Sequence, residues 1–126
     1  HSESEKVEDY RKRLSIKAHS AEQLAGQLSG GNQQKIVLAK WLLTHPKVLF
    51  LDEPTRGIDI NAKNEIYRLI DQLASEGMAI IVVSSELPEI MAISDRIITL
   101  KQGRIGQTFL RSEFTEESIL KASLPA

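Results

Sequence analysis

Two adjacent carboxylates, Asp52 and Glu53, follow directly after the apolar run Val48–Leu51. Successive residues of a strand point to opposite faces, so two neighbouring acids at a strand end can take different tasks. One can hold Mg²⁺ through its water shell, because hard cations prefer oxygen ligands, while the other orients or deprotonates an attacking water. The pair alone is equally compatible with a solvated strand end before the turn that Pro54 begins.

A second candidate site is Ser29-Gly30-Gly31, at the expected start of a helix. Glycines let backbone N–H groups come close to a phosphate, the helix dipole favours an anion, and the hydroxyl group of Ser29 adds a donor. For these three residues alone, a capped helix after a flexible turn is the simpler interpretation, because such caps are common.

The loop that cradles triphosphates, Gly-x-x-x-x-Gly-Lys-Ser/Thr, does not occur in the 126 residues. Gly26 and Gly31 have the required separation, but Asn32 and Gln33 follow them in place of Lys and Ser. The chain therefore lacks the backbone donors and the lysine that usually hold the β- and γ-phosphates.

The order of the motifs within Leu28–Asp59 is more specific than either motif alone. It runs Leu-Ser-Gly-Gly-Asn-Gln-Gln-Lys, a helix, an apolar strand and then Asp-Glu-Pro-Thr-Arg-Gly-Ile-Asp. This order resembles the nucleotide-binding domain of ATP-binding-cassette (ABC) transporters, from about Leu14 to the C-terminus. The Asn of the first motif, the second motif and a later Val-Ser-Ser-Glu-Leu-Pro-Glu-Ile together look like the second cassette of the tandem-cassette ATPases of bacterial ribose, galactose and xylose importers.

The resemblance implies an α/β fold, namely a partial P-loop NTPase (ABC ATPase) fold with a mostly parallel sheet flanked by helices, lacking the P-loop half. In the family, the P-loop and the Q-loop glutamine lie upstream of the signature. The resemblance divides the chain into residues 1–27, a remnant of the helical subdomain, residues 28–110, the C-terminal half of the cassette core, and residues 111–126, a C-terminal helix and tail.

The resemblance also assigns roles at the cassette interface. Ser29, Gly30, Gly31 and Gln33 match the signature loop, which in this family contacts the γ-phosphate of an ATP held by the opposite cassette. Asp59 matches the D-loop aspartate, which lies across the cassette dimer interface.

Three further residues match positions of the hydrolytic site. Asp52 matches the Walker B aspartate that supports Mg²⁺ through water, and Glu53 matches the catalytic glutamate that polarises the attacking water. Ser85 occupies the switch-loop position, where most family members carry a histidine. A hydroxyl group supplies neither the charge nor the reach of an imidazole, so a site that uses Ser85 is expected to be slow or only to bind.

The ligands implied for the full-length protein are ATP and Mg²⁺. The implied partners are the first cassette of the same polypeptide, transmembrane permease subunits and, indirectly, a periplasmic sugar-binding protein. The family works at the cytoplasmic face of the bacterial inner membrane, as a peripheral subunit whose ATP hydrolysis powers carbohydrate import. Because the P-loop is missing, the 126-residue chain is expected to be inactive alone.

Hydrophobic periodicity predicts the elements that position these residues. A helix is expected over Asn32–Thr44, with Ile36, Ala39 and Leu43 on one face and Leu38 and Leu42 beside it. A second is expected after a cap at Asp59 or Asn61, with Ile66, Leu69, Ile70 and Leu73 on one face, and shorter ones around Leu87–Met91 and from Thr115 to about Ala122. Strands are expected over Val48–Leu51, Met78–Val83, Arg96–Leu100 and Arg104–Leu110, with a turn at Gln102-Gly103. The first two strands are apolar throughout, which is typical of strands covered on both faces. The alternation of strands and helices predicts a largely parallel sheet, whose ligands bind beyond the carboxyl ends of the strands.

The composition excludes several kinds of protein. The formal net charge of −1 lacks the basic excess of a protein that coats nucleic acid, and the absence of cysteine excludes disulfides and thiolate metal sites. No run of apolar residues approaches the ~18 of a membrane-spanning helix.

Three hypotheses remain open. The first is a part of a sugar importer's ATPase subunit. The second is an ABC-type ATPase that acts on nucleic acid or ribosomes, which the near-zero net charge disfavours. The third is a non-catalytic cassette kept for assembly, which Ser85 motivates in part. In each case we expect exposed apolar surface on the chain and a tendency to self-associate.

Overall fold

The computed structural model describes residues 30–125 of the chain. The chain forms two compact units, of which the first ends at Val83 and the second begins at Ser84. The helical segment predicted within residues 1–27, and Ser29, lie outside the described residues.

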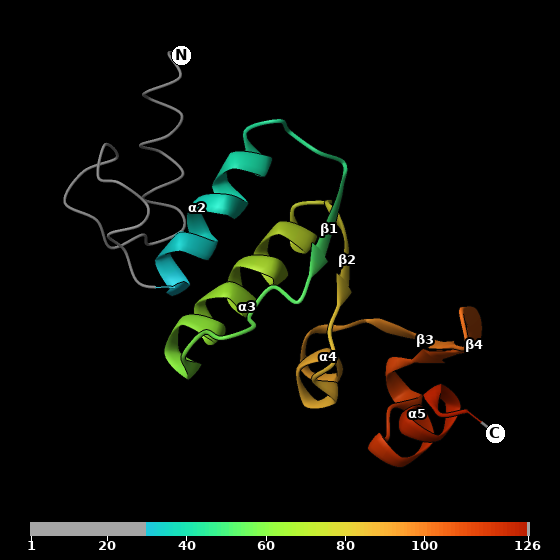
Figure 1. The fold of residues 1–126 in the computed structure, drawn as a ribbon. Coiled ribbons are helices and arrows are strands. Elements are labelled where there is room, and N and C mark those ends of the chain that lie inside the picture. The colour runs from blue at the N-terminus through green and yellow to red at the C-terminus, as the bar shows by residue number, and fades with distance from the viewer. Residues whose placement is uncertain (1–29, 126) are drawn as a thin grey trace. The chain divides into compact units, whose positions relative to one another are not determined.

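The described part of the first unit, residues 30–83, contains two helices and a pair of strands. Helix α2 (Gly30–Leu42) lies beside helix α3 (Ile60–Ser75), and α3 packs against the pair formed by β1 (Val48–Asp52) and β2 (Ala79–Val83) (Figure 1). The two strands are parallel, with Val48 opposite Ala79 and Asp52 opposite Val83. This strand–helix–strand order is the α/β arrangement predicted from the sequence.

Helix α3 confirms the periodicity prediction. Its four expected core residues are all buried: Ile66, Leu69, Ile70 and Leu73. Of the two candidate caps, Asp59 is the one in use, because its Oδ1 accepts a hydrogen bond from the Ala62 amide at 3.0 Å. Gly77, with φ of +100°, ends the helix in a backbone conformation that other residues rarely adopt.

Helix α2 buries a different face from the one the apolar pattern indicated. The expected face of Ile36, Ala39 and Leu43 is half-buried, whereas Leu38 and Leu42 are almost completely buried. The third buried residue of the helix is a lysine, Lys35, in register with the two leucines. Because one position of the packed face is charged, a pattern based on hydrophobicity alone does not identify that face.

The expectation that β1 and β2 are covered on both faces is wrong for the described structure. In β1, Leu49 and Leu51 are buried, but Val48 is 48 % and Phe50 is 70 % exposed. In β2, Ile81 and Val83 are similarly open, at 45 % and 53 %. One face packs on the helices, and no element within residues 30–125 covers the other.

The second unit is a hairpin packed on two short helices. Its elements are α4 (Leu87–Ile93), β3 (Arg96–Lys101), β4 (Arg104–Leu110), a 3₁₀ turn (Arg111–Glu113) and α5 (Glu116–Ser123). Ile97, Phe109 and Ile119 form its buried core. The predicted turn at Gln102-Gly103 is confirmed, with positive φ at both residues, as a two-residue turn of right-twisted strands requires.

The α/β class is therefore confirmed in outline. The described strands form one parallel pair and one antiparallel pair, rather than a mostly parallel sheet. The antiparallel pair arises because a tight turn joins β3 directly to β4, which leaves no room for the crossover that parallel pairing needs.

Candidate functional site

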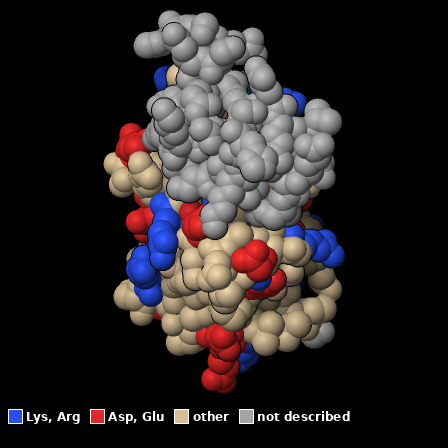
Figure 2. All heavy atoms as spheres, turned by 90° about the vertical axis from the view of Figure 1, so that its left-hand side faces the viewer, with Lys and Arg blue, Asp and Glu red and all other residues tan. Residues whose placement is uncertain are grey.

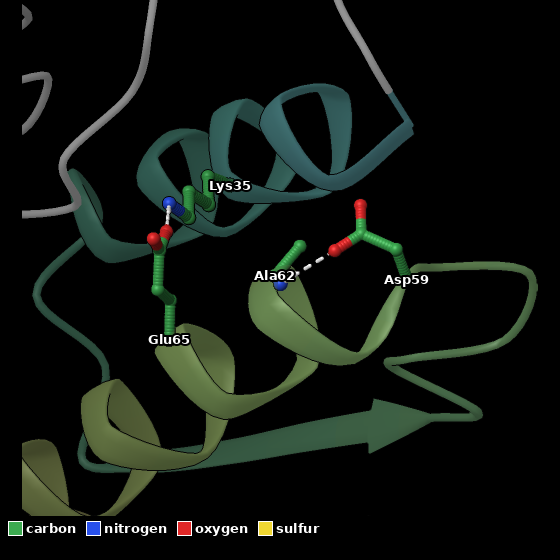
Figure 3. A network of polar contacts seen from close by, with 4 residues as sticks. All are labelled: Lys35, Asp59, Ala62 and Glu65. Carbon is green, nitrogen blue, oxygen red and sulfur yellow. Dashed lines mark hydrogen bonds and ion pairs between the residues drawn. The ribbon is translucent and has the colours of Figure 1, made fainter.

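Several predicted site residues lie at one end of the first unit. Helix α3 runs back along β1, so its start lies at the carboxyl end of that strand, and α2 begins at the same end (Figures 1 and 3). The structure thus brings together Gly30 and Gly31 at the start of α2, Asp52 and Glu53 at the end of β1, and Asp59 at the cap of α3. This is the edge where ligands of α/β sheets bind.

The two carboxylates leave β1 differently, as strand alternation predicts. Asp52 is exposed and lies on the same face as Val48 and Phe50. Glu53 is half-buried and its backbone turns into the left-handed region, with φ of +49°, while its N–H donates to the Val83 carbonyl oxygen at 2.7 Å. Non-glycine residues in this region are uncommon and occur often at functional positions.

Two consecutive turns connect Glu53 to the cap of α3. The Arg56 amide donates to the Glu53 carbonyl oxygen and the Ile58 amide donates to that of Thr55, each at 3.2 Å. Thr55 is 1 % exposed, and Pro54 is also buried. A hydrogen-bonded and partly buried segment therefore connects the two carboxylates to Asp59.

An ion pair joins the two helices whose ends carry the candidate residues. The ammonium group of Lys35 on α2 contacts Oε2 of Glu65 on α3 (Figure 3). The Lys35 side chain is 4 % exposed and that of Glu65 is 35 % exposed. Sequence reasoning missed this pair, although the spacing of Lys35 with Leu38 and Leu42 is a detectable signal. Gln33, a predicted signature residue, is half-buried on the same helix.

Ser85 belongs to the second unit, in the loop before α4. It is exposed, and its neighbour Ser84 organises the loop: the Ser84 hydroxyl group accepts from the Glu86 amide at 3.0 Å and donates to Oε2 of Glu89 at 3.3 Å. Glu89 is 6 % exposed. A buried carboxylate therefore anchors the loop that presents Ser85.

The donor set fits only part of a magnesium site. Within residues 30–125, no three His, Asp or Glu side chains gather as a metal-binding group. Mg²⁺ commonly keeps several waters and binds through one or two carboxylates together with substrate phosphates. The exposed carboxylate of Asp52 suits that arrangement, in which phosphate oxygens provide most of the binding.

The charges on one face of the described part are mixed. On the face in Figure 2, basic and acidic side chains both occur among the described residues, in keeping with the net charge of −1. None of the described helices is both long and apolar enough to cross a bilayer.

Comparison with known sequences identifies close relatives of the chain. The family described as ABC transporter matches residues 2–56. The ribose import ATP-binding protein RbsA of Rhodopirellula baltica is 58 % identical over 123 residues, which are 98 % of this chain and 24 % of that protein. The xylose import ATP-binding protein XylG of Geobacillus kaustophilus is 55 % identical over 118 residues, 94 % of this chain and 23 % of that protein. The chain is homologous to these sugar import ATP-binding proteins and spans about a quarter of their length.

Solved structures agree on the fold. A nucleotide-free ATP-binding cassette from an ABC transporter matches 100 % of this chain and 52 % of its own, with a TM-score of 0.84 and 19 % identity. The dimeric bacterial ABC transporter cassette MJ0796 matches 90 % of this chain and 50 % of its own, with a TM-score of 0.76 and 26 % identity. The chain has the fold of part of an ABC cassette.

Proposed function

We propose that this chain is part of the ATP-hydrolysing subunit of an ABC importer for monosaccharides, within the C-terminal part of a second cassette. The observation that carries the proposal is the ordered set Leu28–Lys35 and Asp52–Asp59, in a chain 58 % identical to a segment of a ribose import ATP-binding protein. The start of α2, the end of β1 and the start of α3, which carry Gly30, Asp52 and Asp59, lie at one end of the first unit and support it.

The proposed roles follow from the resemblance to the ABC family. The signature residues Ser29, Gly30, Gly31 and Gln33 contact the γ-phosphate of an ATP held by another cassette, and the last three lie in the first turns of α2. A helix start suits this task because its free amides and dipole favour an anion. The segment that connects Glu53 to Asp59 lies at the interface between the cassettes.

The hydrolytic roles belong to the end of β1 and to the loop before α4. Asp52 supports Mg²⁺ through water, and Glu53 orients the attacking water in the site completed by a P-loop that these 126 residues do not contain. Bound Mg²⁺ neutralises charge on the phosphates. The family resemblance gives Ser85 the switch position, and a hydroxyl group in place of the usual histidine makes this cassette's site the weaker of two.

The full-length subunit acts with another cassette, a transmembrane permease and a periplasmic sugar-binding protein, at the cytoplasmic face of the inner membrane. In it the β1–β2 pair extends into a larger, mostly parallel sheet. The 126-residue chain alone has no ATPase activity, because it lacks the P-loop. Multiple turnovers by the purified chain would contradict this.

A chimera tests the function directly. The matching 123 residues of the Rhodopirellula baltica protein are replaced by this chain, and ATP hydrolysis is compared with that of the parent protein. We expect activity of the same order; an inactive chimera beside an active parent refutes the proposal. A salt-sensitive shift of DNA or RNA by the chimera, absent from the parent, favours the nucleic-acid alternative instead.

Two substitutions in the chimera test the assignment of the two sites. Ser29→Ala removes a signature donor from the site completed by the first cassette, whereas Glu53→Gln disables only the weaker site. Ser29→Ala should therefore lower turnover more than Glu53→Gln. Equal losses, or the reverse order, exclude the asymmetric arrangement, and no loss from either substitution favours a cassette kept for assembly.

A further inference from the structure

We infer that Lys35 and Glu65 form a positioning pair, which fixes the start of α2 against the start of α3 so that the signature loop and the Asp59 segment meet a nucleotide as one body. The inference rests on the proposed function for its consequence, but its geometric part stands on the first unit alone. The two residues themselves touch no substrate in this proposal.

The location of the pair favours this role. Lys35 follows Gly30 by five residues and Glu65 follows Ile60 by five residues, so each lies about 7.5 Å along its helix from the start. The two helix starts lie at the same end of the unit, and Asp59 caps α3 there (Figure 3). A contact near both helix N-termini influences how these N-termini are oriented, and they carry the candidate residues.

The chemistry of the pair suits a residue pair that positions α2 relative to α3 better than one that only stabilises the fold. Lys35 is packed in line with Leu38 and Leu42, with its side chain 4 % exposed. An apolar residue there would usually serve stability as well or better, because burying an ammonium group costs hydration energy. The ion pair forms only where the helices bring these two positions within reach, so it favours one arrangement of α2 against α3.

The main test uses the chimera with Glu65→Gln, which keeps the size of the side chain but removes its charge. Glu76→Gln is the matched control, since it is the same change at an exposed position at the far end of α3. We expect Glu65→Gln to lower kcat by ~10–100-fold, the range seen when reacting groups are misplaced by about an ångström. The KM for ATP should change less than about 2-fold, because the P-loop that holds the ATP phosphates lies outside this chain, in the rest of the chimera. An unchanged kcat, or an equal loss in Glu76→Gln, overturns the inference.

A second variant separates positioning from folding. Lys35→Met combined with Glu65→Leu replaces both charges of the pair by apolar side chains of similar size, so it is expected to fold with a thermal midpoint near that of the parent chimera. We expect its kcat to remain low. Recovery of kcat to within about 2-fold of the parent chimera would show that ordinary packing positions the helices, and would overturn the inference.

Amide hydrogen exchange on the 126-residue chain tests the geometry without any ATPase activity. In Glu65→Gln, amides at the starts of α2 and α3 should exchange more than ~10-fold faster than in Glu76→Gln, while those of β3 and β4 stay unchanged. Equal rates in the two variants overturn the inference. An inactive parent chimera with this exchange pattern intact counts against the proposed function and leaves the pair supported.

Discussion

Replacing Asp59 separates two roles that meet in one side chain. Its Oδ1 accepts from the Ala62 amide at 3.0 Å and caps α3, and its position matches a residue proposed to lie at a cassette interface. Asp59→Ala removes both roles. Asp59→Asn keeps an acceptor of the same size, because Asn and Asp cap helices about equally well, but removes the charge.

The structure sets the size of the expected effect. Loss of the cap costs about 1 kcal/mol, and α3 supplies much of the buried core of the first unit, namely Ile66, Leu69, Ile70 and Leu73. Fraying of α3 therefore lowers the stability of that whole unit. At 4–8 °C per kcal/mol for a small domain, Asp59→Ala should lower the thermal midpoint by roughly 4–8 °C. Asp59→Asn loses only the interaction of the charge with the helix dipole, about 0.3–1 kcal/mol.

Thermal unfolding of the 126-residue chain, followed by circular dichroism, measures both variants. An unchanged midpoint in Asp59→Ala would refute the capping argument, and an equal loss in both variants would show that charge rather than the hydrogen bond matters. In the chimera, a turnover loss in Asp59→Asn that exceeds its loss of stability supports the interface role.

Three further changes follow from the described packing. Gly106→Ala should destabilise the second unit by about 1–3 kcal/mol in urea unfolding, because a Cβ there would lie 2.9 Å from both Thr99 Oγ1 and the Ala122 carbonyl oxygen; wild-type stability would refute this contact. Gly77→Ala should cost about 1–2 kcal/mol in the same assay, since its φ of +100° disfavours any side chain, even though the added methyl group meets nothing within 4 Å. Phe50→Ser should reduce self-association in light scattering with little loss of stability, because Phe50 is 70 % exposed; a chain that is monomeric without the substitution would contradict the expectation.

Local patterns in the sequence were sufficient for most of the secondary structure. The core face of α3 followed from apolar spacing, and the hairpin turn followed from Gln102-Gly103, because both depend on residues close in the chain. The end of α2 was placed within two residues, at Leu42 instead of Thr44. Asp52 and Glu53 could be assigned to the ligand-binding end of the sheet, because they directly follow a strand predicted to be parallel.

What the sequence could not predict depends on contacts distant in the chain. Lys35 and Glu65 are separated by 30 residues, and nothing in the local pattern of either helix specifies that they meet. Glu89 is a second burial that the apolar pattern does not indicate, although its contact is local: it is 6 % exposed, and its Oε2 accepts from the Ser84 hydroxyl group five residues earlier. In both cases a charge lies where a pattern of hydrophobicity expects solvent, and only the packed structure supplies the partner.

The exposed face of β1 and β2 shows how such a mismatch can itself be informative. Apolar residues on both faces of a strand are typical of a sheet covered on both sides, yet Val48, Phe50 and Val83 are about half or more exposed. A large exposed apolar face on a soluble domain usually marks a contact surface. Homologous proteins are about four times as long as this chain, which covers 24 % of one of them, and the solved cassettes it matches are about twice as long, with 50 % of one covered. The pattern in β1 therefore fits selection within a larger cassette, in which the second face packs against further elements. This supports the proposal that the site at the end of β1 is completed only within that larger domain.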